Sequence, residues 1–283
     1  CDWSSDVCSS DLIQWLVPYA LQIALFPFLC ELVSKKDRQK LGDILSSSCR
    51  LLLAVFVPGA VFLALLAMPI SILIFLGGKT GIELASWAGI STACYCLVLP
   101  AAAVECVLMQ GSFADQKTVA VTVIGIASSM VSVLLSYLFI VIVGVEAEKA
   151  LMVVALGFVL SRCLKSIALA LYLRRSTPMF PARPTMVFLF KLALLAGAVG
   201  AVTWGVSQAV SAILPDGIDA ALAAPDHTGD ISRIRIALRL IVSAGAAGVT
   251  FLAAGFALRL EEPKQMIRWT IGKAIAKISR QKK

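Results

Sequence analysis

Long hydrophobic runs, separated by short polar connections, cover most of the chain. A run of about 20 mostly apolar residues is long enough to cross a bilayer as a helix. A polar turn at 34–50, with four basic residues in its first half, separates the first two runs, a pattern typical of a transmembrane hairpin. The pattern recurs and predicts seven spans at 12–33, 51–75, 84–109, 118–143, 150–173, 186–212 and 236–258. We therefore expect an all-α polytopic membrane protein.

Composition supports this class and excludes a soluble one. The chain is 59% hydrophobic and 15% charged, whereas soluble domains are about 45–50% apolar and about 25% charged. The formal net charge of +8 comes mostly from Lys and Arg in the tail and in the connections on one side of the predicted spans. Such a bias marks the cytoplasmic side of a membrane protein rather than a nucleic-acid-binding face. The first turn and the C-terminal tail are thus expected in the cytoplasm.

The predicted spans divide the chain into four parts. Residues 1–11 are polar, end abruptly at Leu12 and lack the features of a secretory signal, so we interpret them as a non-native, adapter-derived segment. We expect the native chain to continue upstream of them. Residues 12–173 hold five spans, and 174–258 hold an additional hairpin with an outer loop at 214–235. Residues 259–283 form a basic tail, either an amphipathic helix on the cytoplasmic leaflet or a disordered segment.

Charged residues inside predicted spans are the main candidates for function. Arg162 and Lys165 lie near the middle of the fifth span, three residues apart and so on one helical face. A charge at the centre of a membrane helix costs about 2.5–3.5 kcal/mol, which disfavours contact with lipid. Either the two cations line a substrate pathway for an anion, or they snorkel or pair internally. Glu105, in the third span, is a possible partner of Lys165; a proton- or sodium-coupling role is the alternative.

Other polar features have simpler interpretations. Arg50, Arg174 and Arg175 lie at span ends and are expected to be interfacial anchors. Ser128, Ser132 and Ser136 recur at a spacing of four residues, which favours close helix packing rather than a binding site. Prolines at 27, 58, 69 and 100 predict kinked helices.

Enzymatic chemistry has little support in the sequence. The chain has one histidine, His227, in the outer loop, and its eight cysteines form no metal-binding or CxxC pattern. We find no cofactor-binding motif either. The sequence therefore predicts neither an enzyme nor a metal or cofactor site.

A family resemblance extends the analysis. The segment LFPFL from Leu25, the basic turn, and then Arg50-Leu51, Pro58, Pro69-Ile70 and Ile74-Phe75 resemble the MviN/MurJ family of lipid II flippases. Leu99-Pro100, Gly144 and the Leu-Arg-Arg motif at 173–175 are also similar to that family. The chain departs from it after the third span, where Asp115 and Thr118 are followed by Val119 instead of the proline of an Asp-Thr-x-Thr-Pro-like turn.

The resemblance implies a fold, a function and a location. The seven spans would correspond to helices 8–14 of a fourteen-helix flippase of the bacterial inner membrane, with the N-terminal lobe of the same protein as a partner. Such a protein moves an undecaprenyl-diphosphate-linked peptidoglycan precursor by alternating access. The alternatives are an O-antigen-type flippase or a cation-coupled drug exporter of the same superfamily, and a non-transporting membrane scaffold.

Overall fold

The computed structural model describes residues 26–75, 81–142, 144, 147–215, 217–218 and 232–257, and all regular structure within these ranges is helical. Residues 26–34 form a helix that a tight turn joins to the next one. The remaining helices, in chain order, are α2 (Arg38–Phe75), α3 (Ile82–Cys96), α4 (Val98–Ala114), α5 (Thr118–Tyr137) with the π-helical extension η1 (Leu138–Ile142), α6 (Ala147–Arg174), α7 (Ala182–Ile213) and α9 (Arg233–Ala257).

Within the described part of the chain, six helical segments are long and apolar enough to cross a membrane: Arg38–Phe75, Ile82–Ala114, Thr118–Ile142, Ala150–Arg174, Arg183–Ile213 and Arg233–Ala257. They confirm the all-helical membrane fold and match six of the seven predicted spans. Most of the first predicted span (12–33), and all of segment 1–11 and of the tail (259–283), lie outside the described residues. His227 and most of the outer loop lie outside them as well.

The structure corrects the extent of the first polar turn. The prediction placed it at 34–50, but α2 already begins at Arg38, and the turn is confined to residues 35–37. Asp37 caps the new helix by accepting a hydrogen bond from the Lys40 backbone N–H at 3.1 Å. Leu41, Leu45 and Cys49 then recur at four-residue spacing and are buried in the core. This stretch is an amphipathic first part of a helix rather than a loop.

The third predicted span also differs, because it consists of two helices. Helix α3 ends at Cys96 and α4 begins at Val98, with Leu97 in a turn between them. Pro100 lacks the backbone N–H that would bond to the Cys96 carbonyl, so the helical ladder is interrupted at this point. Pro58 and Pro69, by contrast, lie inside the continuous α2.

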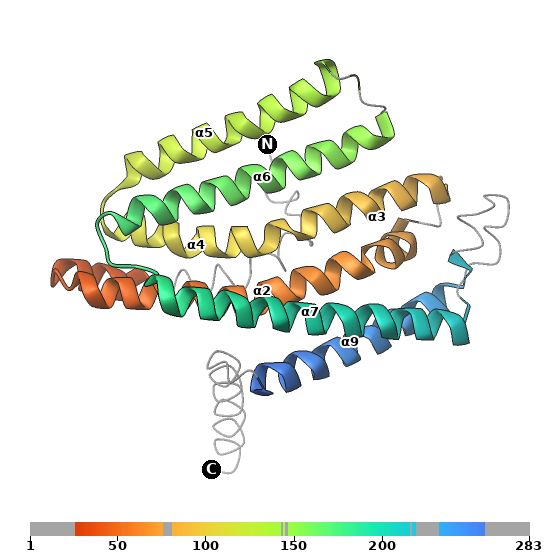
Figure 1. Ribbon diagram of the computed structural model, residues 1–283. Coiled ribbons are helices and arrows are strands. Elements are labelled where there is room, and N and C mark those ends of the chain that lie inside the picture. Colours follow the sequence, from red (N-terminus) through yellow and green to blue (C-terminus); the bar gives the residue numbers. More distant parts are fainter. Residues whose placement is uncertain are drawn as a thin grey trace, which may run out of the picture.

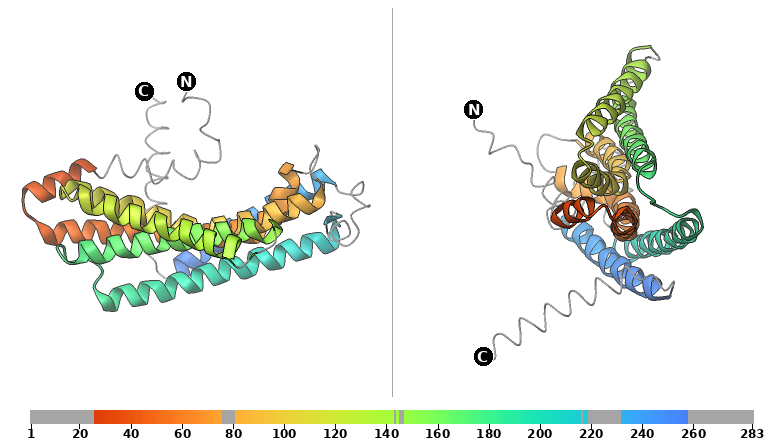
Figure 2. Two further views of the ribbon diagram at one scale, coloured as in Figure 1. Left: turned by 90° about the horizontal axis from the view of Figure 1, so that it is seen from above. Right: turned by 90° about the vertical axis from the view of Figure 1, so that its left-hand side faces the viewer.

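Helix α2 is the centre of the bundle (Figure 1). It packs against α3 and α4 and also against α7 and α9, while α6 packs against α3 and α4 and carries α5 on its outer side. Seen end-on, the pairs α5/α6 and α7/α9 project from this centre in different directions (Figure 2). The largest buried cluster joins α2, α4 and α6, and includes Leu45, Leu108 and Leu169.

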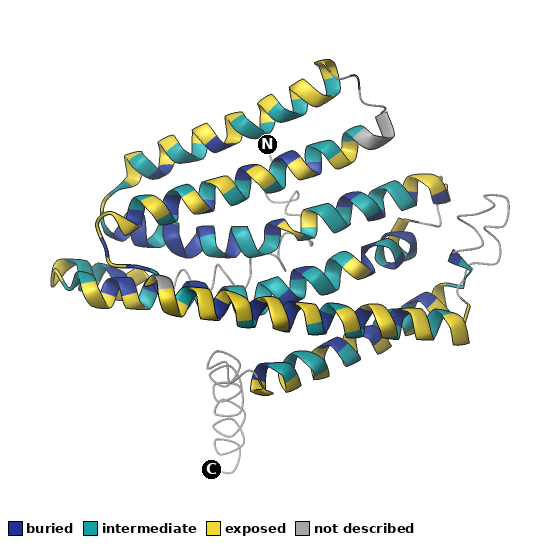
Figure 3. Cartoon of the chain, viewed as in Figure 1, coloured by how far each residue is buried: buried dark blue, intermediate teal, exposed yellow. Residues whose placement is uncertain are grey.

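Helix α5 is the least buried of the spans. Only 6% of the residues in its apolar, membrane-spanning stretch are buried, compared with 33% for α2. Exposed positions, coloured yellow, run along α5 in Figure 3. Val119, Met130 and Val133 are among the exposed residues of this helix. Exposed apolar surface on this scale is what a lipid environment requires.

Three turns lie together at one end of the bundle, which we call the basic end: residues 35–37, 115–117 and 175–181. Asp115 links two of them, since its carboxylate contacts Arg38 at 2.5 Å and Lys117 at 2.7 Å. Lys117 in turn donates a hydrogen bond to Ser176 at 2.6 Å. Lys36, Gln116 and Phe180 adopt positive φ in the three turns. Ionic contacts therefore hold together connections that are far apart in the sequence.

The contact between α2 and the connection that follows α6 leads to a packing prediction. A Cβ atom on Gly42 would lie 2.2 Å from the Pro178 carbonyl oxygen, a backbone atom that cannot move alone. We expect Gly42→Ala to lower the free energy of unfolding by about 1–3 kcal/mol, measured as a fall in Tm in detergent. The matched control is Gly59→Ala in the same helix, where the new methyl group meets nothing within 4 Å and helix propensity favours alanine by about 1 kcal/mol. Equal Tm values for the two variants would contradict the packing argument.

The Asp115 contacts lead to a second prediction. Burial alone would raise the pKa of Asp115, but hydrogen bonds from Lys117 and Arg38 outweigh it and hold this pKa below the usual 3.8. A carboxylate with a lowered folded pKa stabilises the protein well above pH 3.8, and the stabilisation is lost as the pH falls through the folded pKa. We expect Asp115→Asn to lower Tm at pH 7, because the free energy of unfolding falls by about 1–3 kcal/mol. The difference in Tm between this variant and wild type should become smaller at acidic pH.

Asp43→Asn is the control for this experiment, because Asp43 is exposed near the same end of α2. It removes the same charge without breaking the turn contacts, so its effect should stay within about 0.5 kcal/mol. A Tm difference between wild type and Asp115→Asn that does not change between neutral and strongly acidic pH would show that the ion pairs contribute nothing.

Candidate functional site

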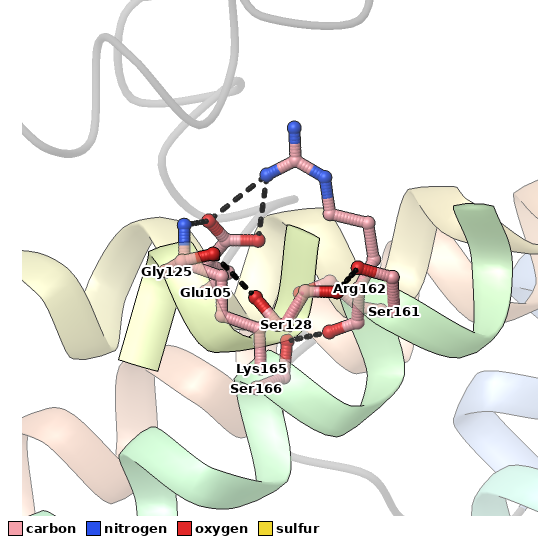
Figure 4. Close-up of polar contacts among 8 residues, drawn as sticks. Glu105, Gly125, Ser128, Ser161, Arg162, Lys165 and Ser166 are labelled. Atoms are coloured by element: carbon pink, nitrogen blue, oxygen red, sulfur yellow. Dashed lines mark hydrogen bonds and ion pairs between the residues drawn. The ribbon is translucent and has the colours of Figure 1, made fainter. Parts of the chain in front are cut away.

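Arg162 and Lys165, on α6, both reach the carboxylate of Glu105 on α4 (Figure 4). The Arg162 Nη1 atom lies 3.0 Å from each Glu105 oxygen, and the Lys165 Nζ atom lies 2.6 Å from Oε1. The predicted Glu105–Lys165 contact is thus confirmed, and Arg162 joins it. We call these three residues the charged cluster.

The charged cluster lies inside the membrane-spanning part of the bundle. The exposed fraction of the side chain is 5% for Glu105, 16% for Lys165 and 28% for Arg162. At about 1.5 Å per residue, Glu105 and Lys165 both lie about 14 Å from the basic end of their helices. An isolated charge at this depth is costly, and mutual neutralisation removes most of that cost.

Neighbouring contacts fix the position of Arg162. Its guanidinium lies 5.1 Å from the centre of the Phe158 ring, one helical turn earlier in α6. Phe158 in turn contacts Tyr95 of α3, with ring centres 5.9 Å apart. The Ser166 hydroxyl bonds to the Ala101 carbonyl at 2.8 Å and thereby joins α6 to α4 at the same level. Neither Phe158 nor Ser166 stands out in the sequence, although Phe158 lies four residues before Arg162, a spacing that places both on one helical face.

Small residues bring α5 close to α6 beside Lys165. The Ser161 hydroxyl donates a hydrogen bond to the Ser128 carbonyl at 2.6 Å, and a Cβ on Gly157 would contact Ser132 and Ser136. The predicted packing role of the serine stripe is therefore confirmed. A Cβ on Gly125 would lie 3.6 Å from both Cε and Nζ of Lys165. The absence of a side chain at Gly125 leaves room for the ammonium group.

An open groove of about 730 Å³ runs between α4 and α5, and among the described residues that line it Lys165 is the one that carries a charge. The other residues lining it are mostly apolar: Met109, Phe113, Val121, Thr122, Gly125, Ile126, Ser129, Met130, Val133, Leu134 and Tyr137. A single cation on an apolar wall fits a ligand with one anionic group and a hydrocarbon part.

The charged cluster holds two cations and one anion, so its formal charge is +1. All the ion pairs that Arg162 and Lys165 form within the described residues are with Glu105. A net charge in surroundings of low dielectric constant attracts a counter-ion strongly. The arrangement is therefore suited to binding an anion such as a phosphate group. A coupling role of Glu105 stays a prediction.

The three predicted anchors lie apart from the charged cluster. Arg50 is twelve residues inside α2 rather than at the start of a helix, and it packs on α7, with Nη2 3.3 Å from the Thr185 hydroxyl and the guanidinium 5.8 Å from the Phe188 ring centre. Arg174 and Arg175 are exposed at the end of α6. Their role as interfacial anchors stays a prediction.

Within the described residues, no group of three or more His, Cys, Asp or Glu side chains lies close enough to hold a metal ion. The six cysteines among these residues are free thiols. The charged cluster is the candidate functional site.

Comparison with known families agrees with this architecture. Residues 12–215 match the family described as lipid II flippase MurJ. The chain belongs to the MurJ family. No curated protein matches it. Members of the MurJ family are transporters of the inner membrane and act in peptidoglycan biosynthesis, which agrees with the six apolar helices. The match includes the charged cluster and the groove, and α9 lies beyond its end.

The charged cluster yields a prediction about stability. Glu105→Gln leaves two cations facing each other in the bundle, and removal of one partner of a buried ion pair costs about 3–5 kcal/mol. We expect Glu105→Gln to lower Tm strongly, and the double variant Glu105→Gln with Lys165→Met to recover part of the loss, because only Arg162 then lacks a partner. Thermal unfolding in detergent measures both. If the effects of the two substitutions simply add, the residues do not interact energetically.

Proposed function

We propose that this protein moves a lipid-linked peptidoglycan precursor, an undecaprenyl-diphosphate carrying its sugar, across the bacterial inner membrane by alternating access. The observation that carries the proposal is membership of the MurJ family, whose match covers residues 12–215. In this proposal the five spans of 12–173 form one lobe, which opposes another lobe of the same protein.

The charged cluster gives this function a physical basis. A diphosphate carries negative charge that has to be neutralised while it crosses hydrocarbon, and the cluster supplies an excess of positive charge. Lys165 presents that charge on the wall of the groove. Arg162, Lys165 and Glu105 are accordingly proposed as part of the substrate pathway. The prenyl chain needs no charge and stays in apolar surroundings.

The proposal includes an orientation. Lys35, Lys36, Arg38 and Lys40 gather at the basic end, and Lys117, Arg174 and Arg175 lie at the same end. Short loops rich in Lys and Arg face the cytoplasm. The basic end, and with it the C-terminal tail, is therefore cytoplasmic in this proposal.

Helices α7 and α9 have a separate role in this scheme. They pack against each other and against α2, and they project away from α5 and α6 (Figure 2). We assign them to a hairpin that lies beside the lobe. This hairpin offers a side groove for the lipid tail. The buried core that attaches them to α2 includes Ala54, Phe188 and Leu195.

Other transporters of the same superfamily fit less well. A cation-coupled drug exporter needs a carboxylate that is available to a coupling ion, whereas two cations occupy Glu105. A non-transporting scaffold does not account for the excess positive charge beside an open groove, because such a charge is costly inside a membrane. An O-antigen-type flippase differs in the sugar and is distinguished by the assay below.

The test is growth of a bacterium whose own lipid II flippase is depleted. We expect the full-length gene product to restore growth and precursor export, and the variant Arg162→Ala with Lys165→Ala to lower export at least about tenfold, since each lost charge-assisted contact is worth about 1.5–3 kcal/mol. Arg183→Gln, which removes an exposed charge outside the cluster, is the control and should export normally.

Two results would overturn parts of the proposal. Failure of the well-expressed wild-type protein to export the precursor, with export of an O-antigen precursor instead, would change the substrate. Normal export by the double variant would remove Arg162 and Lys165 from the mechanism.

A further inference from the structure

We propose that Lys165 is an exchangeable cation: on substrate binding, its ammonium group leaves Glu105 and binds the diphosphate of a prenyl diphosphate lipid in the groove, while Arg162 remains on Glu105. This inference rests on the proposed function and names the contact residue within it. The partner is a prenyl diphosphate lipid because the groove offers one cationic group on an otherwise mostly apolar wall.

The two cations of the cluster are not equivalent. Arg162 contacts both carboxylate oxygens and is held against the Phe158 ring, so its position is fixed from two sides. Lys165 contacts one oxygen, lines the groove, and has Gly125 beside its ammonium group. Lysine is also the better residue for exchange, because its charge is compact and its four-carbon stem is flexible.

Charge balance favours the exchange. In the unliganded state, one carboxylate is shared by two cations and the cluster carries an uncompensated positive charge. After the exchange, Glu105 and Arg162 form a neutral pair and Lys165 faces a phosphate oxygen. Every charged side chain of the cluster then has an opposite partner. The carboxylate of Glu105 therefore keeps an ion-pair partner when the substrate binds.

The rest of the groove identifies the hydrocarbon part of the ligand. Beyond Lys165 its lining continues along α5 with Met130, Val133, Leu134 and Tyr137. A free phosphate ion would gain nothing from these side chains, whereas the isoprenoid units next to the diphosphate would cover them. The arrangement thus combines an anion contact with an apolar track.

Binding of undecaprenyl diphosphate to the detergent-solubilised full-length protein, followed by native mass spectrometry, tests the exchange. We expect Lys165→Met to weaken binding about tenfold or more. The Glu105–Arg162 pair stays intact in this variant, so it should fold. Lys191→Met removes a lysine from α7, outside the cluster and the groove lining, and should bind normally. Unchanged binding by Lys165→Met would overturn the inference.

A rescue experiment separates the contact residue from the positioning residue. In the variant Arg162→Gln, Lys165 is the remaining ion-pair partner of Glu105, so the lysine cannot leave and lipid binding should weaken. Adding Glu105→Gln to this variant releases Lys165, and lipid binding should be restored. The same Glu105→Gln change should not rescue Lys165→Met. If Glu105→Gln rescues both variants or neither, Lys165 does not exchange partners.

Ligand controls identify the source of the anion. Undecaprenol, which lacks phosphate, should bind wild type and Lys165→Met equally, since only the hydrocarbon contributes. Excess phosphatidylglycerol should not displace undecaprenyl diphosphate; if it does, the site takes membrane phospholipid and the proposal is wrong. Precursor export by wild type together with unaltered binding by Lys165→Met would reject the exchange and leave the flippase function intact.

Discussion

A charge in hydrocarbon has to be paired by its neighbours, and in this bundle the carboxylate of Glu105 forms ion pairs with two cations at once. Without it, α6 would present two positive charges three residues apart to α4. The contact therefore determines how α4 and α6 face each other. Because α6 is also the helix on which α5 packs, the position of the groove depends on the same carboxylate.

The bundle combines strongly and weakly attached parts. Helix α2 lies at the centre, and the buried cluster that includes Leu45, Leu108 and Leu169 joins it to α4 and α6. The turns at the basic end add ionic contacts around Asp115. Helix α5 contributes little to this core apart from Val121, since it packs chiefly on α6 and is largely exposed. A groove beside such a helix can change its width at little cost in buried contacts, which suits a transporter that alternates between two states.

The excess charge of the cluster connects this architecture with the family. Structural ion pairs in membranes usually balance, because an unpaired charge is expensive. Here the excess faces a groove lined by apolar side chains, on the lysine whose position is less constrained than that of Arg162. The proposed substrate, a lipid-linked diphosphate, has both the negative charge and the hydrocarbon that this arrangement would accommodate, and the family is described as lipid II flippase MurJ.

The sequence by itself determined the membrane class, the approximate positions of the described spans and the family, because hydrophobic runs of sufficient length and the residues around Pro27, Pro58 and Pro69 are local properties of the chain. It also pointed to the three charges of the cluster. It misjudged the start of α2, since a buried helical face depends on packing, whereas the proline at 100 had predicted a kink close to the break at Leu97. Only the tertiary structure decided that Arg162 shares Glu105 with Lys165, and that Lys165 lines the groove. Small residues such as Gly125 and Ser128 let α5 approach α6 closely beside Lys165, and such a contact between distant segments is a property of the packed bundle.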